Sequence, residues 1–314
     1  MLTSALGDLL SERRYGECRE LAETILRRGS LTDGERGIVY LALSSSLAAL
    51  HSNQEALGPG ELAVYFSRCA GEHDLLGRAL CHLAEVYHEN GLYKRAVGCL
   101  DEYFLAFSLY NLARALEGRA FGQMAQSYQA MGRGPKALEY WRKAYRWHMD
   151  HRTDPQLVDL YRGKLVWQLL KLGQLEPVGA LLGDSEAYLR QAPNDLEARA
   201  RYLNNLAYQA YLTCRYGLAI DTAARVMGLR GARPVRKAQA CLTLHYTARS
   251  LGLVREAVGF GLLGRIQASV ARRPDLEDEA TRALVHMHQR ETLPSIDELL
   301  RGLGRRPGSS GAAG

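Results

Sequence analysis

Histidines and cysteines are considered first, because these side chains most often bind metals or act as nucleophiles. His148 and His151 stand three residues apart and could share one helix face, but no cysteine or carboxylate accompanies them at metal-ligand spacing. The six cysteines are scattered without a CxxC pair, which indicates buried free thiols in a reducing compartment. GxSxG, HExxH and a phosphate loop ending in GKS or GKT are also missing from the sequence. We therefore expect no metal, no cofactor and no enzyme activity.

Regularly spaced arginines suggest a different chemistry, the recognition of carboxylates. Arg78, Arg119 and Arg201 are separated by one and two multiples of a 41-residue interval. A planar guanidinium forms paired hydrogen bonds with a carboxylate, which suits an acidic side chain or a peptide C-terminus. Gln126 and Asn204 offer both a donor and an acceptor, as contact with an extended peptide backbone requires.

The stretch from Leu80 to Leu100, LCHLAEVYHENGLYKRAVGCL, shows which elements must position these residues. Apolar residues recur at spacings of three and four on both sides of Gly91, which predicts two amphipathic helices joined by a tight turn. Small Ala84 and Ala96 stand where the two helices must approach each other, beside large tyrosines. The stretch therefore predicts a helical hairpin.

The hairpin pattern recurs along the chain at steps of about forty residues. Seven hairpins are expected, with turns near residues 13, 52, 91, 132, 173, 214 and 252. Thr32 and Glu35 form a capping-box pattern that opens one helix, and Gly58-Pro59-Gly60 predicts a turn ahead of another. Such constancy of spacing is typical of a repeat protein, in which each unit contacts its neighbours.

The alternation of large, Leu, small and Tyr before the turn, with Tyr and Ala after it, resembles the tetratricopeptide repeat (TPR). The resemblance implies an all-α, right-handed superhelical solenoid, here with a period longer than the 34-residue norm. An armadillo or HEAT-like solenoid has a similar period and is the alternative. We expect a single solenoid over residues 1–304, closed by a capping segment at 275–304, and a disordered tail at 305–314.

In a TPR stack the first helix of each hairpin faces the concave groove, so groove residues recur at fixed repeat positions. These positions are occupied by a mixture of polar, aromatic and cationic residues that predicts a peptide- or partner-binding surface. The candidate set is Arg78, Glu85, Arg119, Gln126, Lys164, Trp167, Arg201, Asn204, Asn205, Tyr208, Tyr246 and Arg249. In the alternative interpretation, the arginines pair with Glu or Asp on adjacent helices and keep the groove soluble.

The phrase LNNLA at residues 203–207, followed by Tyr208, resembles the matching helix of kinesin light chains and of bacterial TPR receptors for signalling peptides. In those families an Asn of this helix can clamp the ligand backbone, a role that the resemblance implies for Asn204 or Asn205. Some of those receptors carry an N-terminal helix-turn-helix, for which this sequence shows no convincing pattern.

Composition and charge limit the remaining classes of function. The chain has 314 residues, 47% of them hydrophobic, as in an ordinary soluble protein with an ample core. Its net charge of +6 is mildly basic and by itself too small to indicate nucleic-acid binding. There is no signal-peptide pattern and no apolar run of membrane-spanning length, so we expect a cytoplasmic protein without a membrane partner.

The function expected from the sequence is a non-catalytic scaffold or regulator that captures a peptide or partner segment. Two alternatives remain. The basic doublets Arg13-Arg14, Arg27-Arg28, Arg272-Arg273 and Arg305-Arg306 could act on transcription or nucleic acid, although cations are favoured at helix ends in any case. Self-association through an end of the solenoid, giving a homo-oligomer, is the other alternative.

Overall fold

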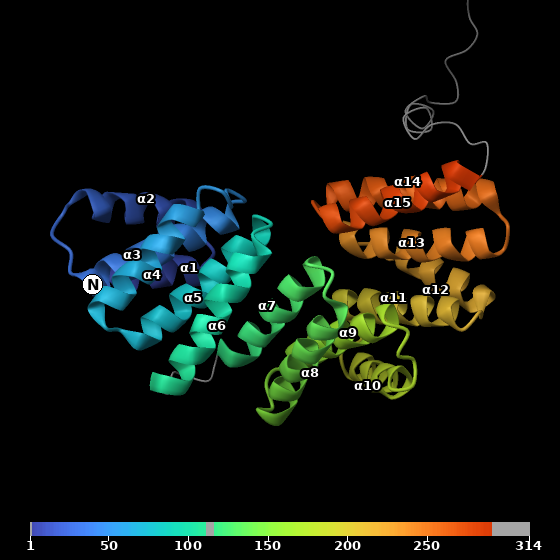
Figure 1. The fold of residues 1–314 in the computed structure, drawn as a ribbon, viewed down its shortest axis with the longest axis horizontal. Helices are drawn as coiled ribbons and strands as arrows, with labels where there is room; N and C mark the ends of the chain where they lie inside the picture. The colour runs from blue at the N-terminus through green and yellow to red at the C-terminus, as the bar shows by residue number, and fades with distance from the viewer. Residues whose placement is uncertain (1, 111–115, 291–314) are drawn as a thin grey trace, which may run out of the picture. The chain divides into compact units, whose positions relative to one another are not determined.

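The computed structural model describes residues 2–110 and 116–290, and this part of the chain is all-α (Figure 1). The described ranges contain no β-strand. The helices, in chain order, are α1 (Leu2–Ser11), α2 (Tyr15–Arg27), α3 (Asp33–Ala49), α4 (Leu57–Ala70), α5 (His73–Glu89), α6 (Tyr93–Tyr110), α7 (Glu117–Ala130), α8 (Gly134–Asp150), α9 (Pro155–Lys171), α10 (Val178–Gln191), α11 (Leu196–Leu212), α12 (Tyr216–Gly228), α13 (Pro234–Ser250), α14 (Val254–Val270) and α15 (Pro274–Arg290).

The helices α1 to α14 form a series of seven hairpins, which confirms the predicted fold class. Each hairpin turns on a residue with left-handed backbone, for example Gly91 (φ 75°) between α5 and α6. The Gly91 amide donates to the carbonyl of His88, and the Leu92 amide donates to that of Tyr87, the double bond of a Schellman turn. Cys214 (φ 57°) makes the same turn between α11 and α12. A turn residue with left-handed backbone therefore joins the two helices of each hairpin.

The apolar stripes of the sequence form the interior of the hairpins. In the α5–α6 hairpin Leu80, Ala84, Ala96 and Leu100 are buried, as their spacing predicts. The small alanines allow the two helix backbones to pack closely, and larger neighbours fill the space beside them.

Two local expectations had opposite outcomes. The capping box at the start of α3 is confirmed, because the Glu35 amide donates to the Thr32 hydroxyl and the Glu35 carboxylate accepts from the Thr32 amide. The expected turn at Gly58-Pro59-Gly60 is wrong, since these residues lie in the first turn of α4. Proline is tolerated there because the first amides of a helix have no intrahelical acceptor.

The chain divides into two compact units, residues 1–153 and 154–314, and each is described by itself. The expectation of one solenoid over residues 1–304 remains a prediction. Of the expected cap at 275–304, α15 is described as far as Arg290, while its remaining part and the tail at 305–314 lie outside the described residues. None of the described helices combines the length and apolar character needed to span a membrane.

Candidate functional site

The first helices of the hairpins in the C-terminal unit lie next to one another in a row. Helix α9 contacts α11, α11 contacts α13, and α13 contacts α15 (Figure 1). We call α9, α11, α13 and α15 the inner row. It carries eight of the twelve residues predicted from the sequence: Lys164, Trp167, Arg201, Asn204, Asn205, Tyr208, Tyr246 and Arg249.

A buried ion network links α9 to α11. Asp159 Oδ2 accepts a hydrogen bond from Arg201 Nη2 at 2.6 Å, and Asp159 Oδ1 accepts one from Arg162 Nη1 at 3.2 Å. The side chains of Arg201 and Asp159 are only 6% and 3% exposed. Buried charges require such pairing, because the loss of water around each ion costs several kcal/mol. Arg201 therefore follows the alternative interpretation of the arginines, pairing with an acid on the adjacent helix.

The Arg201 side chain reaches Asp159 by crossing the surface of Gly163. A Cβ atom at Gly163 would lie only 2.4 Å from Arg201 Cδ, so a larger residue could not stand there without displacing the arginine. The carbonyl of Gly163 accepts from Asn205 Nδ2 at 3.0 Å. One helix further on, Asn204 Nδ2 donates to the carbonyl of Arg236, also at 3.0 Å. Both asparagines thus tie α11 to a neighbouring helix of the inner row.

A second ion cluster joins α11 to the start of α13. Glu197 accepts from Arg236 Nε at 2.6 Å and from Arg233 Nε at 2.9 Å. Burial alone would raise the pKa of Glu197, but the hydrogen bonds and charges of the two arginines outweigh it and lower that pKa below its ordinary value. Glu197 is therefore ionised at neutral pH.

Lys164, on α9 next to Gly163, lies within the field of these arginines. Burial lowers the pKa of Lys164 to about 7, and the positive charges of Arg236, Arg273, Arg201 and Arg233 act in the same direction. The amine is thus held in surroundings that disfavour its own positive charge. A strongly shifted group beside a specific charge cluster is a candidate for a functional role.

Four aromatic rings gather toward the C-terminal ends of the inner helices. Trp167 lies 5.1 Å from Tyr208, Tyr208 lies 5.9 Å from Tyr211, and Tyr211 lies 5.9 Å from Tyr246, between ring centroids. We call these four residues the aromatic cluster. All four are partly buried, and they come from three successive helices of the inner row.

Lys171 holds the aromatic cluster to the last helix of the row. Its ammonium group lies 5.1 Å from the Trp167 ring centroid and 5.6 Å from that of Tyr208, close enough for cation–π attraction. It also pairs with Glu279 of α15 at 2.7 Å, and Glu279 accepts from Tyr246 Oη at 2.9 Å. Because Lys171 is on α9, the inner row curves enough for side chains of its first and last helices to touch.

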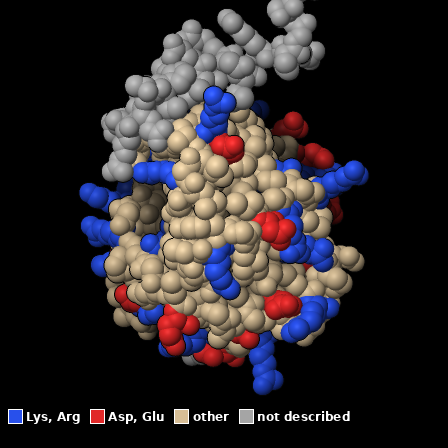
Figure 2. Space-filling model, turned by 90° about the vertical axis from the view of Figure 1, so that its right-hand side faces the viewer, with Lys and Arg blue, Asp and Glu red and all other residues tan. Residues whose placement is uncertain are grey.

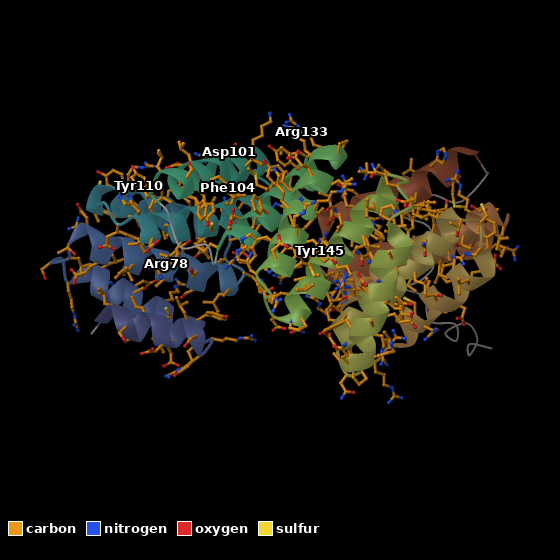
Figure 3. The ribbon with its side chains drawn as sticks, turned by 90° about the horizontal axis from the view of Figure 1, so that it is seen from below. Arg78, Asp101, Phe104, Tyr110, Arg133 and Tyr145 are labelled. Atoms are coloured by element: carbon orange, nitrogen blue, oxygen red, sulfur yellow. The ribbon has the colours of Figure 1, made fainter. Side chains whose placement is uncertain are left out.

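The other four predicted residues, Arg78, Glu85, Arg119 and Gln126, lie in the N-terminal unit. Arg119 is paired with Glu85, and their side chains are 52% and 46% exposed. Arg78 and Gln126 are exposed. Figure 3 marks Arg78 on α5, while Asp101 of α6 and Arg133 ahead of α8 lie along one edge of the unit. The structure therefore joins Arg201, Asn204 and Asn205 to neighbouring inner helices and brings Trp167, Tyr208 and Tyr246 together in the aromatic cluster. Arg249 lies partly buried in the last turn of α13, and the candidates of the N-terminal unit lie at its surface.

Sequence reasoning missed the acidic partners of this network and one of its cations. Asp159, Glu197 and Glu279 were not predicted as site residues, and neither was Lys171. A usable signal exists for Asp159, because it precedes Arg201 by 42 residues, one repeat interval plus one. An Asp or Glu about one repeat away from an arginine, on the first helix of the adjacent hairpin, is therefore a candidate for an ion pair with that arginine.

In each basic doublet that is described, one arginine is seen in an ion pair. Arg14 pairs with Glu12 at 3.0 Å, Arg27 with Glu23 at 3.6 Å, and Arg273 with Asp275 at 2.6 Å. Arg305-Arg306 lies outside the described residues. Figure 2 shows one face of the molecule, on which basic and acidic side chains are interspersed over a mainly uncharged surface.

The histidines that could have formed a metal site make other contacts. His148 Nδ1 lies 2.9 Å from the Thr153 hydroxyl, and His151 Nδ1 lies 2.8 Å from the Trp147 carbonyl. Among the described residues, no three His, Cys, Asp or Glu side chains are grouped so that they could hold a metal ion.

The hairpin series defines a TPR-like helical repeat protein. No family model and no curated protein sequence matches the chain. Its fold is similar to that of NprR in complex with its cognate peptide NprX, with a TM-score of 0.66 and 12% identity over 96% of this chain and 91% of that one. It is also similar to the Rap conjugation gene regulator of plasmid pLS20 in complex with the Phr* peptide (TM-score 0.60, 15% identity, 96% of this chain and 82% of that one).

A third solved structure, BtubC from P. vanneervenii, extends the comparison (TM-score 0.51, 17% identity, 83% of this chain and 98% of that one). At these identities the likeness concerns the fold alone. This likeness in fold agrees with the resemblance to TPR proteins that the repeat pattern of the sequence indicates.

Proposed function

We propose that this chain is a non-catalytic binding protein or regulator that holds a peptide, or an extended segment of a partner protein, against the inner row of its C-terminal unit. The aromatic cluster carries the proposal, because four partly buried aromatic rings from α9, α11 and α13 meet at one place. Tyr and Trp combine a large apolar body with a polar tip, and they are enriched at recognition surfaces for that reason.

The solved structures with a similar fold support the same function. NprR is seen with its cognate peptide NprX, and the Rap regulator with the Phr* peptide. Under our proposal, this chain uses the same fold for the same class of ligand. The polar groups of Lys164 and Lys171 would orient the ligand, while Trp167 and Tyr208 would supply apolar contact.

Affinity selection from a randomised hexapeptide library tests the proposal. The wild type is compared with Trp167→Ala and Tyr208→Ala, and with Leu218→Ala as a matched control at an exposed site on α12, outside the inner row. We expect the wild type and the control to retain the same peptides. Each aromatic variant should weaken their binding by about 2 kcal/mol or more, as for a buried aromatic anchor. Equal retention by all four proteins would contradict the proposal.

Variants of Arg201 and Asn204 are poor reporters of ligand binding, even though they belong to the predicted site. Arg201 is paired with Asp159 inside the unit, and Asn204 bonds the backbone at Arg236. Replacing either residue would disturb the packing of the inner row, so peptide binding would weaken whether or not that residue contacts the peptide itself. Trp167 and Tyr208 are better reporters because they retain partial exposure.

A further inference from the structure

An ion pair joins the first and the last helix of the inner row, α9 and α15. Lys171 Nζ lies 2.7 Å from Glu279 Oε1, although the two residues are 108 positions apart and α11 and α13 come between their helices in the row. Packed helices lie about 8–10 Å apart, so three steps along a flat row would separate α9 from α15 by about 24–30 Å. Two side chains cannot span that distance. The pair is therefore made across the concave side of a strongly curved row.

The ammonium group of Lys171 also covers part of the aromatic cluster. It lies 5.1 Å from the Trp167 ring centroid and 5.6 Å from that of Tyr208. Tyr246 Oη donates to Glu279 Oε1 at 2.9 Å, the same oxygen atom that pairs with Lys171. An apolar side chain of a ligand can pack on the ring faces that Lys171 covers only if the ammonium group moves away.

The ion pair is not what anchors α15 in the unit. Leu276 and Ala280 of this helix are buried in an apolar cluster with residues of α13 and α14. The side chains of Lys171 and Glu279 are 29% and 22% exposed, and an ion pair with this much access to water contributes little to folding stability. Lys171 can therefore leave Glu279 by rotating about its own side-chain bonds while α15 stays in place.

We propose that Lys171, Glu279 and Tyr246 form a latch, which holds Lys171 over Trp167 and Tyr208 and which the peptide ligand must open to reach these rings. The proposal rests on the proposed peptide-binding function and adds a regulatory step to it. Once released from Glu279, the Lys171 amine is available to orient the ligand.

The latch predicts an effect opposite to that of a ligand contact. When a protein binds only in its open form, its apparent affinity is reduced by the fraction of molecules that are open. Weakening the latch should therefore strengthen peptide binding. Removing a group that contacts the peptide should weaken it.

Two variants weaken the latch without removing an aromatic ring. Glu279→Gln removes the charge that holds Lys171, and Tyr246→Phe removes only the hydroxyl group that donates to Glu279. Glu277→Gln is the matched control, because Glu277 lies on the same helix but pairs with Arg265 of α14, at 3.7 Å. Peptides selected from the hexapeptide library with the wild type and with Glu279→Gln are titrated into each protein by calorimetry.

We expect Glu279→Gln to bind these peptides about threefold to tenfold more tightly than the wild type, and Tyr246→Phe to show a smaller gain. Glu277→Gln should bind as the wild type does. Unchanged or weaker binding by Glu279→Gln, or an equal gain in Glu277→Gln, would overturn the latch and leave the peptide-binding function standing. Failure of every protein to bind any peptide would overturn the peptide-binding function, and the latch with it.

A carbodiimide cross-link tests the latch without relying on affinity. The reagent joins an amine to a carboxylate in contact with it, here by forming an amide between Lys171 and Glu279 with loss of water. We expect mass spectrometry to find this link in the free wild type, and a saturating peptide to lower its yield about fivefold or more. A link that is missing from the free protein, or whose yield is unchanged by a bound peptide, would overturn the latch.

Discussion

Arg119 and Arg201 occupy the same position in two hairpins of one repeat series, yet their surroundings are opposite. Arg119, in the N-terminal unit, pairs with Glu85 at the surface, where both side chains are about half exposed. Arg201, in the C-terminal unit, pairs with Asp159 in the interior, where both are almost completely buried. A repeat position therefore fixes which helix face a residue occupies, whereas the neighbouring helices decide whether it meets water.

The same contrast holds for the two units as a whole. Asp159, Arg162, Arg201 and Arg236, each at most 8% exposed, are the least exposed Asp, Glu, Lys and Arg residues of the described chain, and all four belong to the C-terminal unit. The buried polar residues of the N-terminal unit are serines and His148. Because apolar packing stabilises a core at least as well as buried ions do, stability alone gives no reason for this network. We attribute it to the proposed ligand site, which it borders.

Replacing the central acid of the network should have the largest effect. In Asp159→Asn, Arg162 and Arg201 lose their common carboxylate while remaining buried, which should cost about 3–5 kcal/mol of unfolding free energy. The matched change at the surface, Glu85→Gln, should cost no more than about 1 kcal/mol. Urea unfolding of both variants measures the difference. Similar losses in the two would show that the contrast between the two pairs has no energetic consequence.

Replacing Gly163, whose surface the Arg201 side chain crosses, should have the next largest effect on stability. Gly163→Ala places a methyl group against the Arg201 side chain, so we expect a loss of about 1–3 kcal/mol from overpacking. At Gly98, in α6 of the N-terminal unit, a Cβ atom would meet nothing within 4 Å, and Gly98→Ala should instead stabilise by about 0.5–1 kcal/mol. Thermal unfolding should therefore shift in opposite directions for the two variants, and a shift in the same direction would contradict the packing described at Gly163.

A further effect should appear in the pH dependence of stability. Since the pKa of Lys164 falls from 10.5 to about 7 on folding, the unfolded state binds more protons between these values, and the contribution of Lys164 to stability rises with pH. Lys164→Gln removes this titration. The stability of the wild type relative to the variant should thus increase as the pH is raised from about 7 toward 10.5, as measured by urea unfolding. A flat difference for Lys164→Gln would mean that folding leaves the pKa of the Lys164 amine unchanged.

Much of the fold could be predicted from the sequence because it depends on local patterns. The spacing of Leu80, Ala84 and Ala96 gives the hairpin interior, and the turn expected at Cys214 is present even though cysteine replaces the usual glycine. Gly58-Pro59-Gly60 misled the prediction, because the same residues are compatible with a turn and with the first turn of a helix.

The candidate site was less predictable because its contacts join residues about one repeat apart. Repeat positions placed Arg201, Asn204 and Trp167 on the inner helices correctly. They could not show that Arg201 is buried, since that depends on Asp159 of the preceding repeat and on the missing side chain at Gly163. The pairing was open to two interpretations until the neighbouring helices were placed.

The smallest expected effect is that of Arg119→Ala, and it tests most directly whether the two units differ in ligand binding. Arg119→Ala removes an exposed ion pair, so its cost should stay below about 1 kcal/mol, whereas Arg201→Ala leaves Asp159 buried with one partner fewer and should cost several times more. If the ligand site is confined to the C-terminal unit, Arg119→Ala should also retain library peptides as the wild type does. A stable Arg119→Ala protein that loses those peptides would instead support the arginine ladder predicted from the sequence, because an arginine that contributes little to folding would then be required for binding.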